Sequence, residues 1–136
     1  MPILDHWELP LTTDEILRAQ GADPESIRAR RPALITRIEQ SISIGKHFLH
    51  PLVLYEKYPV KKLTHERLEL IHPDLAGKAY LSGELIAQHL SRASELIVIL
   101  CTIGSELDEC VSSLFNSDPM SAISMDGMGS LSLIHI

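Results

Sequence analysis

The stretch Ile97–Ser130, IVILCTIGSELDECVSSLFNSDPMSAISMDGMGS, carries the strongest structural signals in this chain. It continues a β-branched aliphatic run, Leu96–Leu100, which favours a strand over a helix. Because the run is aliphatic and is flanked by helix-capping signals, we expect Leu96–Cys101 to be a central, buried strand. The tripeptide Thr102-Ile103-Gly104 then ends the strand, and a helix with one apolar face is expected over Glu106–Phe115.

Two helix starts are expected within this stretch. Ser105 stands where an N-cap would precede the acidic first turn of the first helix. Asp118-Pro119 combines a capping residue with proline at the first helical position of the second helix.

The second helix is expected to place its larger apolar residues on or near one side. These residues are Met120, Ile123 and Met128. Gly127 and Gly129 each cost a helix roughly 1 kcal/mol relative to alanine. Two such glycines predict that another part of the chain approaches the helix backbone closely.

Upstream, three more helix starts are predicted. Thr12 and Glu15 have the spacing of a capping box, and Gly21 is expected to stop the helix. Asp23-Pro24 starts the next helix, and Pro32 interrupts it. From Pro32 to Lys46 the apolar residues form one stripe, which consists of Leu34, Ile35, Ile38 and Ile42.

The middle of the chain changes character. His50–Val60 favours a strand that Pro51 and Pro59 bracket, and Leu63–Ile71 is expected to be a second extended stretch. A helix is predicted over Leu81–Leu90, with Ser82 as its cap and Leu85, Ile86 and Leu90 facing inward. Strands that alternate irregularly with helices indicate an α+β fold, with helices packed on a small mixed or antiparallel sheet.

Composition excludes several classes of protein. The chain has 136 residues, 45% of them apolar and 4% aromatic, so one aliphatic domain or part of one is expected. A net charge of −6 argues against nucleic acid as the main partner. No window is apolar enough for a membrane span, and no signal peptide is evident. With two cysteines and no disulfide framework, we expect a cytoplasmic location.

Three positions combine a possible chemical role with a structural one. Thr102-Ile103-Gly104 precedes a helix and could hold an anion, but a tight strand-to-helix turn is favoured. Asp118 is interpreted as a cap. Asp126 lies in mid-helix among small residues, so it either faces solvent or points into a cleft.

A metal site is not expected. Cys101 and Cys110 are too far apart for a usual zinc pair, and buried structural thiols are favoured. His47 and His50 could share a helix face, but no carboxylate or cysteine partner stands at ligand spacing.

The order of these signals resembles a known family. The chain is similar to the activation domain of cobalamin-dependent methionine synthase, in its free-standing bacterial form. The similarity lies in the order of a strand, Thr-Ile-Gly, a helix, Asp-Pro and then Asp126-x-x-Gly129-Ser130. The resemblance extends upstream through Asp14–Arg18 and Leu81–Leu90. It covers most of residues 10–130. The family-motif positions, to which no role is assigned, are Thr102, Gly104, Asp118, Asp126, Gly129 and Ser130.

The resemblance implies a supporting role in methyl transfer. The family's domain binds S-adenosylmethionine and presents it to oxidised cobalamin, while a flavodoxin-type reductant delivers an electron. The implied partners are a corrinoid-binding protein or methionine synthase modules. The family's donor-binding segment, of the type Arg-Pro-x-x-Gly-Tyr-Pro, is not present in this sequence, so no catalytic or cofactor-binding residue is carried over. A second hypothesis is a docking module without a ligand, which holds a corrinoid protein or methyltransferase through its acidic surface.

The last six residues, Leu131–Ile136, read as a separate feature. They match the translation of a DNA sequence that resembles the transposon-end adapter used to prepare sequencing libraries, and the alternative is a natural apolar tail. We therefore expect residues 1–130 to be the N-terminal part of one activation-domain-like domain, and 131–136 to be an artefact without specific packing.

Overall fold

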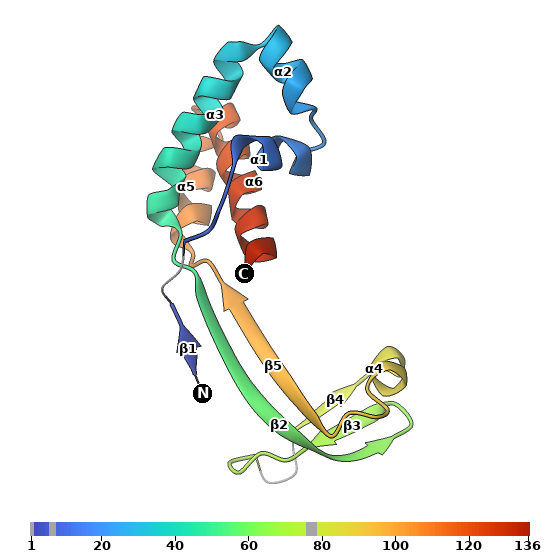
Figure 1. The fold of residues 1–136 in the computed structure, drawn as a ribbon. Helices are drawn as coiled ribbons and strands as arrows, with labels where there is room; N and C mark the ends of the chain where they lie inside the picture. The colour runs from blue at the N-terminus through green and yellow to red at the C-terminus, as the bar shows by residue number, and fades with distance from the viewer. Residues whose placement is uncertain (1, 6–7, 76–78) are drawn as a thin grey trace. The chain divides into compact units, whose positions relative to one another are not determined.

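The computed structural model describes residues 2–5, 8–75 and 79–136 and forms two compact units. The sheet unit consists of Leu54–Leu100 and the N-terminal residues up to Ile3. The helical unit consists of Leu4–Val53 and Cys101–Ile136 (Figure 1). Within the described residues there are six α-helices and a five-stranded antiparallel sheet, which confirms the α+β class.

Five α-helices and a short 3-10 turn make up the helical unit. They are α1 (Thr13–Ala19), α2 (Pro24–Arg30), α3 (Pro32–Gly45), η1 (Lys46–Phe48), α5 (Glu106–Leu114) and α6 (Pro119–His135). The upstream helix starts are confirmed. The Thr12 hydroxyl accepts the Glu15 amide at 3.3 Å while the Glu15 carboxylate accepts the Thr12 amide at 3.1 Å, which completes the capping box. Asp23 caps α2, and α3 begins at Pro32.

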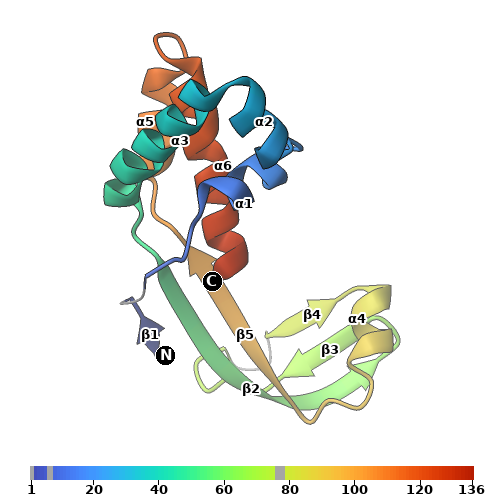
Figure 2. The ribbon, with the colours of Figure 1, turned by 45° about the horizontal axis from the view of Figure 1, so that its top comes forward.

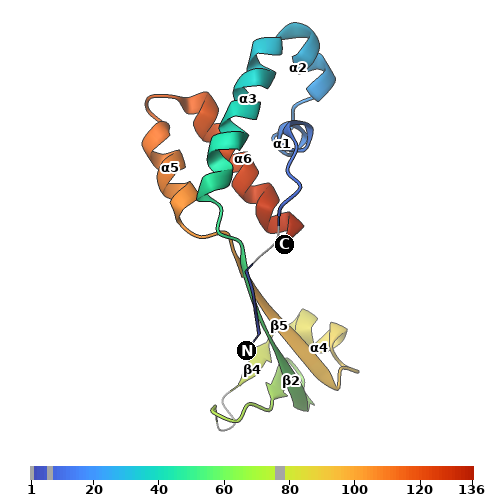
Figure 3. The ribbon, with the colours of Figure 1, turned by 60° about the vertical axis from the view of Figure 1, so that its left-hand side comes forward.

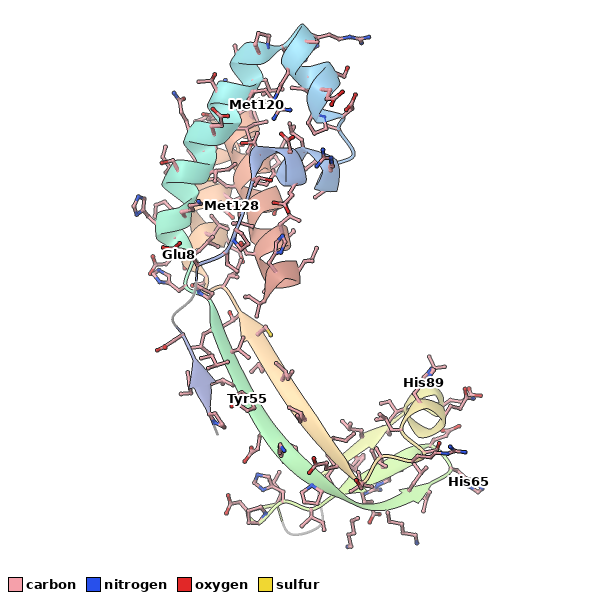
Figure 4. All side chains as sticks on the ribbon, viewed as in Figure 1. Glu8, Tyr55, His65, His89, Met120 and Met128 are labelled. Atoms are coloured by element: carbon pink, nitrogen blue, oxygen red, sulfur yellow. The ribbon has the colours of Figure 1, made fainter. Side chains whose placement is uncertain are left out.

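Helix α6 organises the core of the helical unit. It packs against α1, α3 and α5 (Figures 2 and 3). Met125 and Met128 are almost fully buried in this core, and Figure 4 labels Met128 on α6. The expected apolar side of α6 is wrong in part, because Met120 and Ile123 are exposed. The buried face instead carries small residues beside the two methionines, since neighbouring helices approach it closely.

The predicted close approach at the two glycines of α6 is confirmed. A Cβ added to Gly129 would lie 2.9 Å from Leu107 Cδ2 of α5. A Cβ added to Gly127 would lie 2.7 Å from Gln20 Nε2. The Gln20 side-chain amide also donates to the Ile123 carbonyl at 2.6 Å. Glycine therefore lets α6 sit against α5 on one side and the end of α1 on another.

The sheet is built around one long strand. The strands are β1 (Ile3–Leu4), β2 (Leu52–Thr64), β3 (Arg67–Leu70), β4 (Tyr80–Ser82) and β5 (Glu95–Thr102). Their order is β1-β2-β3-β4, and β5 pairs with β2. Pairing of Thr64 with Arg67 closes a β2–β3 hairpin, with His65 at its turn (Figure 4).

Two boundaries in the sheet unit differ from those expected. Leu63–Ile71 is not one extended stretch, because the hairpin turn divides it and β2 runs on through Pro59 to Thr64. Pro59 is tolerated because its carbonyl still accepts the Ile71 amide at 2.9 Å, beside a register irregularity at Val60–Lys62.

The predicted helix over Leu81–Leu90 is shorter than expected. Helix α4 spans Glu84–His89 and packs on β3 and β4. Ser82 lies in β4 and is not the cap, because Leu81 and Ser82 pair with β3. Gly83 precedes the helix with φ +149°, a conformation that suits glycine. Ile86 and Leu90 are half-buried, but Leu85 is exposed.

The strand over Leu96–Cys101 is confirmed, but its expected burial is wrong. Ile97, Val98, Ile99 and Leu100 are 42–65% exposed, and consecutive residues point to opposite faces of the sheet. Among the described residues, β5 pairs with β2 alone. An aliphatic run thus specifies the strand but does not itself supply the layers that would bury it.

The tail also differs from its expected behaviour. Helix α6 does not stop at Ser130 but continues into the tail and ends at His135. Leu131 is 8% exposed and belongs to the helical core, and Ser132 is fully buried. These residues continue the buried face of α6, and the Ser132 hydroxyl donates to the Met128 carbonyl at 2.8 Å. The expectation that the tail makes no specific packing contribution is therefore wrong.

Within the part of the chain that the structure describes, no helix combines the length and apolarity needed to cross a membrane.

Candidate functional site

A hollow of about 250 Å³ lies in the helical unit, where β5 ends and α6 passes by. We call it the strand-end hollow. Its lining residues are Cys101, Thr102, Ile103, Gly104, Asp108, Asp126, Gly129, Ser130 and Leu133. They come from three places: the end of β5 with the following turn, the first part of α5, and the second half of α6 from Asp126 to Leu133.

The turn that forms one wall of the hollow is fixed by local chemistry. Gly104 has φ +80°, which a side chain would disfavour. The Gly104 amide donates to the Thr102 hydroxyl oxygen at 3.1 Å. A Cβ added to Gly104 would also stand 3.3 Å from the Cβ of His50. Because the Gly104 amide is already bonded, the geometry supports the tight-turn interpretation over an anion site.

The opposite wall depends on the close packing of α5 and α6. Gly129 is buried against Leu107 and Ile103, so the two helices approach closely at this level. Asp126, one helical turn before Gly129, and Ser130, directly after it, remain exposed at the hollow. Asp126 therefore combines the two alternatives considered for it, since it is open to solvent and lines a hollow.

Ser105 stands at the predicted start of α5 but does not cap it. Its hydroxyl contacts the Glu109 carboxylate at 3.2 Å and bonds no helix amide. Ser105 has helical backbone angles, φ −101° and ψ −13°, which turn its side chain away from the free amides of the first turn.

Asp118 lies apart from the hollow, as the cap of α6. Its carboxylate accepts the Ser121 amide at 3.2 Å and the Ser121 hydroxyl at 2.7 Å. It also pairs with the Arg37 guanidinium of α3. The Arg37 hydrogen bond, followed by those from Ser121, lowers the pKa of Asp118 from 3.8 to about 2. Its role is structural: it ties the start of α6 to α3.

The structure thus brings together five of the six family-motif positions around the hollow, with Asp118 as the exception. It also adds Asp108, which the sequence motif did not include. Asp108 and Asp126 present carboxylates, and Thr102 and Ser130 present hydroxyls. A site of this kind accepts hydrogen bonds and suits a ligand that donates them or carries positive charge.

A histidine contact beside the hollow was not expected from the sequence. His50 Nε2 lies 3.1 Å from a Glu106 carboxylate oxygen, and the His50 amide donates to the Ile103 carbonyl at 2.8 Å. The two residues are distant in sequence, and no spacing signal could have paired them. His50 thereby holds the segment before β2 against the turn that follows β5.

The cysteines are not a buried structural pair. Cys101 is exposed at the hollow, whereas Cys110 is half-buried with its Sγ 3.9 Å from Met125 Sδ. Within the described residues, no group of three or more histidines, cysteines or acidic residues could hold a metal ion.

Comparison with known proteins gave no assignment: no family model matches the chain, and no curated protein matches it significantly.

Proposed function

We propose that this chain is a methionine synthase activation-domain-like protein, which supports S-adenosylmethionine-dependent reductive methylation of a cobalamin or corrinoid methyltransferase. One observation carries the proposal. Thr102 and Gly104 come from the end of a strand, Asp126, Gly129 and Ser130 come from the middle of a helix, and all five line one hollow. Residues that carry a family resemblance are expected to meet in space if the resemblance reflects function.

The size of the hollow limits what it can hold. At about 250 Å³ it lies below the roughly 300–1,000 Å³ of sites that enclose a drug-sized ligand. It would therefore form one wall of a larger donor site, with Asp108 and Asp126 toward the cationic part of the donor. This fits the expectation that the chain, which has no Arg-Pro-x-x-Gly-Tyr-Pro-type segment, binds S-adenosylmethionine weakly or not at all by itself.

The contribution of the chain to the reaction would be positioning. S-adenosylmethionine supplies the methyl group, and a flavodoxin-type reductant supplies the electron that oxidised cobalamin needs. The hollow would orient the donor while the rest of the surface docks a corrinoid-binding protein or methionine synthase modules. The whole process is proposed to take place in the cytoplasm.

The first experiment measures binding by titration calorimetry. The chain is titrated with a methionine synthase cobalamin module, and separately with S-adenosylmethionine. Binding to the module together with donor binding weaker than micromolar supports the proposal. Micromolar donor binding by residues 1–130 alone would show that the donor site does not depend on an Arg-Pro-x-x-Gly-Tyr-Pro-type segment. Absence of binding to the module would contradict the proposal.

The second experiment separates the proposed role from that of a ligand-free docking module. The gene is sequenced past the Ser130 codon, and the natural downstream sequence is added to the chain. Return of oxidised cobalamin to methylcobalamin is then followed by absorbance, with donor and reductant present. Asp126→Asn should slow reactivation, and Glu39→Gln on the exposed face of α3 should not. This result would support the role of the hollow. Module binding without any donor-dependent reactivation would favour the docking module.

A further inference from the structure

The outer edge of β5 is a surface that the proposed function does not use. Strand β5 pairs with β2, and no described strand pairs along its other side (Figure 1). Within the sheet unit, the four residues Ile97–Leu100 are all 42–65% exposed. The sequence from Leu96 to Thr102 contains neither a charged residue nor a proline.

The chemistry of such an edge determines what it can bind. An unpaired edge presents a row of free backbone amides and carbonyls, which another extended strand satisfies. Monomeric proteins usually protect such edges with charged residues, prolines or bulges. In the same sheet β2 carries Lys57, Lys61 and Lys62, whereas the one charged residue of β5 is Glu95 at its first position. The β5 edge is therefore suited to strand pairing.

We propose that β5 is a dimerisation edge, at which β5 of a second copy of this chain pairs in the antiparallel direction. The backbone decides which residues of β5 can pair with a further strand. The Ser94 carbonyl accepts the Val60 amide of β2 at 2.9 Å, so the polar groups of Ser94 face β2. Because these groups alternate sides along a strand, those of Ile97 and Ile99 face outward. We place the two-fold axis at Val98, the middle residue of the aliphatic run Leu96–Leu100, so that Ile97 of each copy pairs with Ile99 of the other.

The charges near β5 favour antiparallel over parallel pairing of the two copies. In the antiparallel pair the two Glu95 residues lie at opposite ends, and each already has Lys57 of its own chain at 3.7 Å. Parallel pairing would set one Glu95 beside the other, and like charges in direct opposition are destabilising. The neutral centre of β5 also lets two chains of net charge −6 meet without local repulsion. The strand is thus complementary to itself.

The first test measures mass by light scattering over a range of concentrations. The natural chain should form a dimer. Val98→Lys should weaken dimerisation roughly tenfold or more, because the two ammonium groups would stand opposite each other at the axis. Val98→Thr, which keeps a neutral β-branched side chain, should leave the dimer intact. Val98 is exposed, so both variants should keep the circular dichroism spectrum of the natural chain.

The second test maps the register by disulfide formation in a Cys101→Ser background. Val98→Cys should give a covalent dimer on mild oxidation, because the two cysteines face each other within disulfide distance. Ile97→Cys should not, because Ile97 lies opposite Ile99 of the other copy. A natural chain that stays monomeric, or larger assemblies that Val98→Lys does not dissociate, would overturn the proposal. Equal cross-linking by the two cysteine variants would also overturn it.

Discussion

Ile38 of α3 and Ile99 of β5 are both isoleucines, but one is buried and the other is exposed. Ile38 is 2% exposed in a core shared by α1, α3, α5 and α6, whereas Ile99 is 60% exposed. Within the sheet unit, Leu68 and Leu70 are the described hydrophobic residues that reach full burial. The two units therefore rely on different forces. Packed side chains stabilise the helical unit, and backbone pairing with few buried contacts stabilises the sheet unit.

The largest expected difference comes from the same substitution at these two positions. Ile38→Ala removes buried methyl groups and leaves a cavity, which should lower the free energy of unfolding of the helical unit by about 2–5 kcal/mol. At concentrations too low for the proposed dimer, Ile99→Ala should change stability by about 0.5 kcal/mol or less, because the side chain of the single chain is already in water. Urea denaturation followed by circular dichroism measures both. Similar losses for the two variants would show that β5 is covered in solution.

The tail gives a second test of how far the helical core extends. Removal of Leu131–Ile136 deletes the buried Leu131 and Ser132, and should lower the free energy of unfolding by about 2–4 kcal/mol. Leu131→Ala should account for much of that loss. The matched variant Ile134→Ala, at a position 75% exposed, should change little. A deletion without effect on the melting temperature would place the boundary of the folded unit before Leu131.

The approach of α5 to α6 is a third point at which the helical unit can be disturbed. Gly129→Ala should cost about 1–3 kcal/mol, because the new Cβ would meet Leu107 at 2.9 Å. In a Leu107→Ala background the same change should be neutral or favourable, since the space is free and alanine is the better helix former. A double-mutant cycle in urea measures the coupling. Additive losses would mean that the contact with Leu107 is not the cause.

Local signals in the sequence predicted most of the helical unit. Thr12, Asp23 and Asp118 begin helices because each cap acts on amides two or three residues away, within reach of sequence reasoning alone. The glycines at 127 and 129 predicted close approach correctly for a similar reason. Glycine in mid-helix is costly unless a neighbour needs the space.

Burial in the sheet unit could not be predicted in the same way. The sequence of β5 specifies a strand, but its burial depends on which elements cover it, and that is a property of the whole fold. The hollow shows the same limit. Its motif positions were identified from the sequence, but Asp108 and the His50–Glu106 contact depend on tertiary packing between distant segments.

The smallest expected effect is on the pH dependence of stability that arises from the Asp118–Arg37 contact between α6 and α3. The Arg37 and Ser121 hydrogen bonds lower the pKa of Asp118 to about 2, from 3.8. The carboxylate therefore stabilises the folded helical unit at pH values above about 4, and this contribution is lost as the pH falls toward 2. Asp118→Asn should reduce stability at neutral pH and flatten the decline in the free energy of unfolding between pH 4 and pH 2. Glu39→Gln, at an exposed position on α3, should keep that decline. The effect should be modest and should shrink with added salt, because half of the Arg37 side chain is exposed and water screens the pair. Urea denaturation at a series of pH values measures it, and an unchanged pH slope in Asp118→Asn would show that another carboxylate carries the acid sensitivity.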